Sequence, residues 1–341
     1  MLTSRPAPIR RRVLALGLTA LAVPLLTATQ IPSASAFGTV RTLGQHAEHE
    51  NITRAALACR PDARSDGSCF EPRSLDQIAG RAGTFGAVGA PDSDESLTPA
   101  AHCDNADHLA AFGYPRTREQ ATRQLQACVT ALRTRFEEGV GAAGGTVRAD
   151  GTLAAAESDL AKDCTFTLGA PGRDKCEAIE GLGRALHGVQ DFYSHSNWTD
   201  KPATDRPTGK DNPPGLNLPA PSPLLALADG RPFQPSAVPA DLTTGCFSVL
   251  LGCSGRVQHG DLNKDKGVID PATGATSAPA TPRGKTAGNF DRAVHGAVTD
   301  TRRQWADFRT ALIRSYGKER GERIACVLTH DTPQRDCAPA N

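Results

Sequence analysis

Over much of the chain, small and apolar residues recur every three or four positions, the period of an amphipathic helix. This pattern predicts helices around residues 52–59, from 74, over 117–139, over 179–198 and over 290–317, with shorter ones over 152–163 and 319–329. Thr117 is placed to cap the third of these helices and Gly139 to end it. The sequence therefore predicts an all-α, mainly helical fold.

The character of the sequence changes between residues 200 and 285, where prolines and glycines cluster and no strong strand pattern emerges. A structureless stretch of this length is unusual inside a compact domain unless it serves the function. We interpret it as an irregular, Pro/Gly-rich excursion that partly covers the functional site. The candidate ligands described below are spread from His49 to His259 and must converge, so we expect residues 37–341 to form a single helical metal-binding domain.

Residues 1–36 have the organisation of a signal peptide. Basic Arg10-Arg11-Arg12 precedes an apolar run over 13–26, and Ala34-Ser35-Ala36 is a small-residue cleavage site. We expect a secreted, extracellular protein whose mature chain begins at Phe37. The arginines also permit twin-arginine export, so the route stays open. No stretch is apolar enough to predict a transmembrane segment.

Ten cysteines in an exported chain predict five disulfides. We predict pairing between sequence neighbours: Cys59–Cys69, Cys103–Cys128, Cys164–Cys176, Cys246–Cys253 and Cys326–Cys337. The formal net charge is +1, and removing the four arginines of the signal gives 1 − 4 = −3. The mature chain therefore lacks a basic stripe for a nucleic-acid backbone, which makes nucleic acid a less favoured partner. We expect a monomer.

The candidate chemistry centres on His187, Asp191 and His195, which are spaced four residues apart on a predicted helix. A step of four turns the helix face by about 40°, so all three side chains share one face. Neighbouring members lie about 6 Å apart along the axis and can share one ion, whereas His187 and His195 lie about 12 Å apart. Burying such groups without a metal is costly. The spacing therefore predicts more than one metal ion.

Other histidines stand beside carboxylates elsewhere in the chain. His49 falls on the same face as the apolar positions of the first predicted helix, His102 is followed by Asp104, and His259 is followed by Asp261 and Asp265. Imidazole and carboxylate together suit zinc. The alternatives stay open, because a polar run such as 260–265 also forms ordinary turns. Four further histidines are better explained as surface or packing residues: His46, His108, His295 and His330.

Residues 186–198, Leu-His-Gly-Val-Gln-Asp-Phe-Tyr-Ser-His-Ser-Asn-Trp, resemble the signature of the heterokaryon-incompatibility HET-C family. That family is similar in turn to zinc-dependent phospholipase C and to the S1/P1 nucleases. Residues 49–53, 102–105 and 262–265 resemble further pieces of the same pattern in the same order. Over essentially its whole mature length, the chain more closely resembles CinY-type secreted actinobacterial proteins.

The resemblance implies a mainly helical, phospholipase C/P1 nuclease-like fold around two or three zinc ions that cleave phosphodiesters. It implies metal ligands from the four motifs and from outside them: Phe37, His49, Asp94, His102, His187, Asp191, His195, His259 and Asp265. In this arrangement Asp191 bridges two ions, and Phe37 binds through the amino and carbonyl groups of the mature N-terminus. Asp104 is a candidate catalytic residue that orients the nucleophile.

The chain departs from the related pattern at three places. The related proteins usually have Trp where Phe37 stands, and they place five residues, not three, between the bridging Asp and the next His. Asp94 is preferred only narrowly over Asp92 as the upstream acid. No H-x-x-x-D/E follows His195, so His259 with Asp265 or Asp261 is the substitute for completing the third ion's ligands.

Three functions remain in view. The first is a secreted zinc-dependent hydrolase of phosphodiesters, phospholipase C-like and directed at a phospholipid. The second is a non-catalytic secreted scaffold or accessory protein that keeps one structural metal; a link to peptide-antibiotic production rests only on the CinY-type resemblance. The third is an S1/P1-like nuclease.

Overall fold

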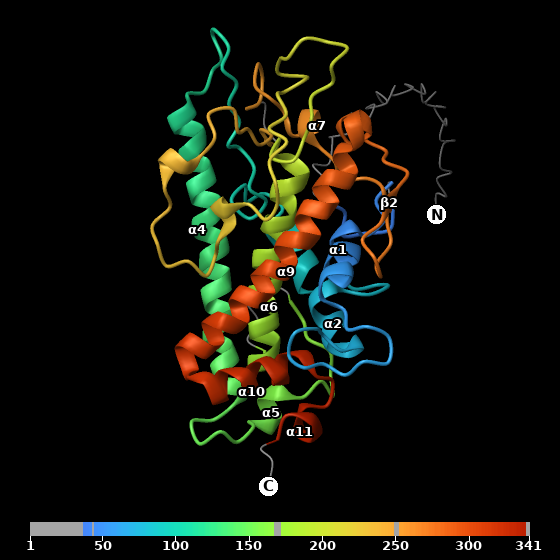
Figure 1. Cartoon of the computed structure of the whole chain (residues 1–341), viewed down its shortest axis with the longest axis vertical. Helices are drawn as coiled ribbons and strands as arrows, with labels where there is room; N and C mark the ends of the chain where they lie inside the picture. Colours follow the sequence, from blue (N-terminus) through green and yellow to red (C-terminus); the bar gives the residue numbers. More distant parts are fainter. Residues whose placement is uncertain (1–36, 43, 167–171, 249–251, 339–341) are drawn as a thin grey trace, which may run out of the picture. The chain divides into compact units, whose positions relative to one another are not determined.

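The computed structural model describes residues 37–42, 44–166, 172–248 and 252–338, all of which belong to one unit of the chain, Ala34–Asn341. The expected signal peptide, residues 1–36, lies outside the described residues. The described part is mainly helical (Figure 1), which confirms the predicted fold class at that level. None of its helices is long and apolar enough to cross a membrane.

The helices are α1 (Glu48–Leu57), α2 (Pro72–Ala79), α3 (Gly86–Asp94), α4 (Arg118–Ala143), α5 (Ala155–Ser158), α6 (Asp174–His195), α7 (His259–Leu262), α8 (Pro282–Lys285), α9 (Asn289–Tyr316), α10 (Lys318–Thr329) and α11 (Pro333–Asp336). Two antiparallel strands, β1 (Val268–Ile269) and β2 (Thr276–Ser277), form a short hairpin. Four 3₁₀ turns complete the described elements: 144–146, 223–225, 235–237 and 286–288.

Helix α6 is the centre of the fold, and 19 of its 22 residues are buried. It packs against α3, α4 and α9, and Figure 1 shows α9 crossing in front of it with α4 to one side. Glycines allow the closest approaches. A Cβ atom on Gly181 would lie 2.5 Å from the Gly139 backbone nitrogen of α4, and one on Gly183 would lie 2.4 Å from the Ala87 side chain of α3. The helix that carries the candidate ligands is therefore shielded from solvent by its neighbours.

The helix predictions were right in place and less accurate at the ends. Thr117 forms the expected capping box with Gln120 at the start of α4. Gly139 does not end α4, which continues to Ala143, because this glycine serves the contact with α6 instead. The prediction over 152–163 was largely wrong, since only Ala155–Ser158 is helical there. Helix α3 was not predicted.

The segment 200–285 is more ordered than a wholly irregular excursion. It contains α7, α8, both strands and two of the 3₁₀ turns. It also adds apolar side chains to the core, among them Leu224, Leu225, Leu242, Val257 and Leu262. The expected description as a loose Pro/Gly-rich excursion is therefore not confirmed.

All ten cysteines pair as predicted between sequence neighbours, in five disulfides that close loops with separations of 7 to 25 residues. Two of these bonds lie beside candidate ligands. Cys103–Cys128 ties the chain between His102 and Asp104 to α4, and Cys246–Cys253 closes the loop before His259. Both segments are thereby restrained in the unfolded chain as well as in the folded one.

A pair of glycine substitutions tests the close packing of α4 on α6. Gly181→Ala forces a Cβ atom against the α4 backbone, which cannot move like a flexible side chain. We expect it to lower the free energy of unfolding by about 1–3 kcal/mol. Gly141→Ala is the matched control, because a Cβ there meets no atom within 4 Å. Its helix propensity should raise stability by about 0.5–1 kcal/mol. Urea denaturation of the oxidised protein measures both changes, and equal effects would refute the packing argument.

Candidate metal centre

The first centre forms where α6 meets the chain after α3. His187 donates from Nδ1 to the Val88 carbonyl at 2.8 Å, and His102 donates from Nε2 to the Glu95 carbonyl at 3.3 Å. In a neutral imidazole the other nitrogen of each ring then carries a lone pair. His187 Nε2 lies 2.9 Å from His102 Nδ1 and 3.0 Å from Asp191 Oδ2, and His102 Nδ1 lies 2.9 Å from that same oxygen. Three acceptor atoms thus face one point.

Asp92 supplies a fourth oxygen to the first centre. Its Oδ1 lies 3.8 Å from His187 Nε2, and its Oδ2 accepts a hydrogen bond from the Thr39 hydroxyl. Ligand atoms of Asp92, His102 and His187 all lie within 4.8 Å of one another, as a metal ion requires. We define the first centre as Asp92, His102, His187 and the Oδ2 atom of Asp191.

The second centre is the group of His49, His187 and Asp191, whose ligand atoms lie within 4.8 Å of one another, so it shares His187 with the first centre and uses the other oxygen of Asp191. His49 Nδ1 donates to Gln190 Oε1 at 2.7 Å, because the Gln190 amide nitrogen donates to the hydroxyls of Thr53 and Thr301. The His49 Nε2 lone pair therefore points at Asp191 Oδ1, 3.2 Å away. Both atoms are buried and have no hydrogen-bond partner among the described residues. Two such atoms in contact need a cation between them, which is either a proton on the imidazole or a metal ion. Burial alone would lower the pKa of His49, but Asp191 outweighs it and raises this pKa.

Phe37 lies beside the second centre. Its side chain is fully buried, and its ring meets the His49 ring edge to face at 5.9 Å. The His49 backbone nitrogen donates to the Gly38 carbonyl at 3.3 Å, and Glu48 accepts from the Gly38 nitrogen at 3.1 Å. The start of the described chain is therefore held against α1, next to the position that the resemblance gives to an N-terminal ligand.

The third centre lies one helical turn further along α6. His195 Nε2 donates to Asp265 Oδ1 at 2.9 Å, which leaves the buried His195 Nδ1 without a hydrogen-bond partner among the described residues. This nitrogen lies 3.6 Å from Asp104 Oδ1, and His259 Nδ1 lies 3.2 Å from the same oxygen. We define the third centre as Asp104, His195 and His259, whose ligand atoms lie within 4.8 Å of one another.

The expected roles of Asp104 and Asp265 are exchanged in this geometry. Asp104, expected to orient a nucleophile, lies among the ligand atoms of the third centre. Asp265, expected as a ligand, binds His195 Nε2 and the Ser194 hydroxyl and lies 3.7 Å from His259 Nε2. A carboxylate that fixes the outer nitrogen of a ligating histidine is a common support for zinc. The contacts of Asp265 are therefore those expected of a residue that positions His195.

The structure also corrects the preference for Asp94. Both Asp94 carboxylate oxygens bind the Arg184 guanidinium, at 2.8 and 2.7 Å, so Asp94 belongs to a salt bridge on α6. Asp92, two residues earlier on α3, is the acid that reaches the histidines. Asp261 lies apart from the centres and accepts a hydrogen bond from the Gln258 nitrogen at the start of α7.

The electrostatics keep two fully buried carboxylates of the site ionised. Burial alone would raise the pKa of Asp191, but the His187 and His49 imidazoles outweigh it and hold this pKa well below its usual range. Burial likewise opposes ionisation of Asp265, and His195 overcomes it, lowering the pKa to about 2. Anionic oxygens are thus available to a cation without a prior proton loss.

Sequence reasoning missed the residues that orient the ligands. Gln190 stands next to Asp191 in the motif and fixes His49, while Ser194 stands next to His195 and binds Asp265. Lys264 Nζ binds the carbonyls of Ser196 and Leu262, which joins the end of α6 to the end of α7. The only sequence signal for the first two was their place inside the helix motif.

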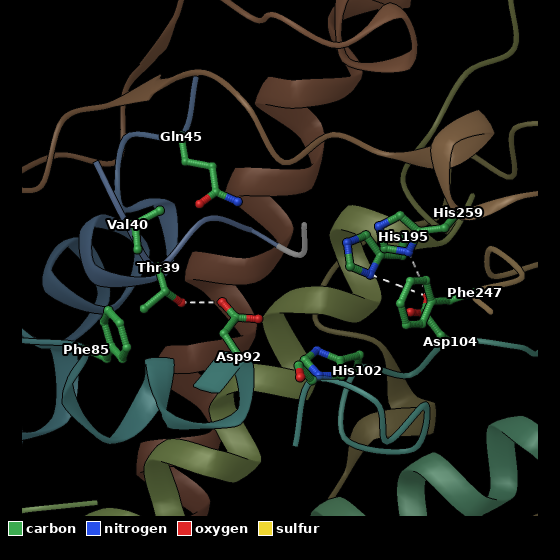
Figure 2. Close-up of a pocket in the computed structure, with 11 residues that line it drawn as sticks. Thr39, Val40, Gln45, Phe85, Asp92, His102, Asp104, His195, Phe247 and His259 are labelled. Carbon is green, nitrogen blue, oxygen red and sulfur yellow. Dashed lines mark hydrogen bonds and ion pairs between the residues drawn. The ribbon is translucent and has the colours of Figure 1, made fainter. Parts of the chain in front are cut away.

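A cavity of about 190 Å³ opens onto two of the centres (Figure 2). Asp92 and His102 of the first centre and all three members of the third line it, and Figure 2 shows their side chains turned toward the same space. Phe85 and Phe247 are its aromatic walls. His49, His187 and Asp191 do not line this cavity. The first and third centres are therefore accessible from one side.

The donor set fits zinc. Imidazole nitrogens and carboxylate oxygens are zinc ligands, and three protein ligands with an open side are typical of catalytic zinc sites. The buried, unpaired atoms of His49, Asp191 and His195 support the fit independently. A further group, Cys326, His330 and Cys337, is also compact, but its two sulfurs are joined in a disulfide and offer no thiolate.

No family model matches the chain, and no curated protein or solved structure is significantly similar to it. The class of protein is therefore defined by the site: a mainly helical, disulfide-bonded protein with a His- and Asp-rich candidate metal centre on one buried helix.

Metal content separates the two upstream acids. We expect wild-type protein loaded with zinc to hold two to three ions per chain by elemental analysis, and Asp191→Asn to lose the ions that this carboxylate bridges. Asp92→Asn should weaken zinc binding by about tenfold or more, because a ligand oxygen is lost. Asp94→Asn is the matched control and should keep wild-type zinc, although it disturbs the Arg184 salt bridge. One ion or none in wild type would refute the cluster.

Two variants test the third centre in parallel, one of a proposed ligand and one of a carboxylate that orients a ligand. His259→Ala should remove one zinc ion and leave the others, because His259 does not belong to the first two centres. Asp265→Asn should keep the stoichiometry but weaken one ion by about 10–100-fold, as expected for an orienting carboxylate. Competition with a zinc chelator measures both. Complete loss of that ion in Asp265→Asn would instead make Asp265 a ligand.

Proposed function

We propose that this protein is a secreted zinc-dependent phosphodiesterase of the phospholipase C-like type. The observation that carries the proposal is the shared cavity, onto which ligand side chains of the first and third centres open side by side. Metal sites that only stabilise a fold are closed by their protein ligands, whereas this arrangement leaves room for a substrate.

Zinc in these centres would polarise phosphoryl oxygens and make water a better nucleophile at neutral pH. The protein's own contribution is to hold each ligand in one orientation. The Val88 carbonyl fixes His187, Gln190 fixes His49, and Asp265 fixes His195. Asp191 places one oxygen in each of two centres, which sets their separation. Ligands fixed before the substrate arrives reduce the reorganisation that catalysis requires.

The walls of the cavity favour a single phosphodiester group over a nucleic-acid strand. None of the described residues that line it is a lysine or an arginine, so it offers no charged track for a polyanionic backbone. Val40, Phe85 and Phe247 give it apolar surface beside the polar ligands. A phospholipid headgroup next to its glycerol and acyl chains presents this combination of charge and apolar surface.

An S1/P1-like nuclease is the second candidate. Two phenylalanines in the cavity wall, Phe85 and Phe247, are suited to stacking against a base, an interaction that tolerates every sequence. A non-catalytic scaffold with one structural metal is the third, and an accessory role in peptide-antibiotic production would fall under it. The assay below separates all three.

Hydrolysis is tested on zinc-loaded protein with a soluble short-chain phosphocholine diester and with single-stranded nucleic acid. We expect turnover of the phosphocholine diester and slower or no cleavage of nucleic acid. His102→Ala and Asp104→Asn should each reduce the rate by about 100-fold or more, because each removes a ligand of a centre that faces the cavity. Asp94→Asn is the control that keeps activity. Preferred cleavage of nucleic acid would favour the nuclease, and a fully loaded but inactive protein would favour the scaffold.

A further inference from the structure

Phe112 is the most exposed large apolar side chain among the described residues, with a relative accessibility of 109%; Leu97 follows with 66%. It stands at the tip of the loop 109–114, which leads from the third-centre segment into α4. Figure 1 shows the chain before α4 projecting beyond the start of that helix. Its exposed neighbours Ala110, Ala111 and Gly113 are small, and the loop carries no charge. An apolar tip of this kind is fully hydrated. Moving it out of water into an apolar environment is favourable.

The base of this loop is fixed. Tyr114 donates from its hydroxyl to the buried Asp107 at 2.7 Å and accepts from the Val257 nitrogen at 2.8 Å. The His108 nitrogen donates to the Thr243 hydroxyl at 2.9 Å. Phe112 is therefore held away from the protein by a well-bonded base, and the core does not compete for it.

Positive charge surrounds the base of the loop. A polar cavity of about 320 Å³ is lined by Arg116, Arg123, Arg256 and three uncharged residues. Asp107 pairs with Arg116 and Arg256, whereas Arg123 is exposed and makes no hydrogen bond or ion pair that involves another described side chain. Three arginines and one aspartate leave a local charge of 3 − 1 = +2. The apolar tip thus stands beside a site suited to an anionic phosphate group.

The base of the loop and its arginines lie close in sequence to ligands of the third centre. Asp107 follows Asp104 by three residues, and Arg256 precedes His259 by three. The Asn105 side chain accepts a hydrogen bond from the Phe247 nitrogen at 2.9 Å, and Phe247 forms a wall of the metal-lined cavity. A partner surface bound to the loop would therefore lie near the metal-lined cavity.

We propose that the loop 109–114, together with Arg116 and Arg123, docks this protein on anionic phospholipid bilayers. Phe112 enters the boundary between headgroups and acyl chains, and the arginines bind lipid phosphates. A bilayer fits better than a protein partner, because a single projecting side chain with alanines and a glycine beside it offers little of the roughly 1,000 Å² that a specific protein interface needs. In a fluid bilayer, lipids can rearrange around a single inserted side chain. The docking stands apart from catalysis; that the substrate is met in the bilayer rests on the proposed function.

Vesicle sedimentation tests the docking on the full, zinc-loaded protein, kept on ice to limit any hydrolysis. Wild type should bind phosphatidylcholine vesicles that contain phosphatidylglycerol more tightly than pure phosphatidylcholine vesicles. Phe112→Ser should weaken binding to both by about tenfold or more. Arg123→Gln should cost about fivefold, and only on the anionic vesicles.

Ile313→Ser is the matched control. Ile313 is also exposed, at 36%, but it lies near the end of α9, where Tyr316 contacts the C-terminal end of α4 through the Val140 carbonyl. The 26-residue helix α4 separates this end from the loop by roughly 35 Å. Ile313→Ser should bind vesicles as wild type does. Equal losses in Ile313→Ser and Phe112→Ser would overturn a specific role for the loop.

A fluorescence measurement reports the insertion itself. The two native tryptophans, Trp198 and Trp305, are buried, so Phe112→Trp adds an exposed fluorophore. Its emission should shift to the blue with anionic vesicles and be quenched by brominated acyl chains. No shift on bound vesicles, or concentration-dependent self-association that Phe112→Ser abolishes, would overturn the inference. Turnover of the soluble diester by Phe112→Ser should stay unchanged, so loss of docking and loss of hydrolysis are read separately.

Discussion

The structure depends on one physical constraint: α6 buries His187, Asp191 and His195, and Asp191 Oδ1 and His195 Nδ1 have no hydrogen-bond partner among the described residues. In an apolar interior, unpaired acceptors cost several kcal/mol in all, by the order of magnitude known for buried polar groups. A divalent cation relieves this cost at each centre. The tight packing of α3, α4 and α9 around α6 therefore favours a helix whose buried polar groups are paired with one another or with a bound cation.

The elements around α6 are arranged so that one ring nitrogen of each imidazole is held by a hydrogen bond. Helix α3 presents the Val88 carbonyl to His187, α6 itself presents Gln190 to His49, and the chain after α7 presents Asp265 to His195. These supports come from distant parts of the sequence, so they form only when the fold is complete. The closing of the 200–285 segment onto the core thus also sets the third centre.

The sequence carried the helical ligand spacing and the disulfide pairing because both are local. A period of four residues places three side chains on one face whatever the rest of the chain does, and all five disulfides join near neighbours. The choice between Asp92 and Asp94 was not local. It depended on Arg184, ninety residues away, which takes both oxygens of Asp94. The roles of Asp104 and Asp265 were equally out of reach, since each depends on which ring nitrogen of His195 it faces.

The three centres differ in what they can contribute. The second lies in the interior, with His49 and Asp191 excluded from the cavity, while the first and third face it. An ion at the second centre would be shielded from substrate and would act mainly on Asp191, whose other oxygen belongs to the first centre. Charge withdrawn from that carboxylate would make it a weaker donor to an ion in the first centre, which would then be the stronger Lewis acid. An interior ion of this kind would therefore tune the chemistry at the cavity without contacting the substrate.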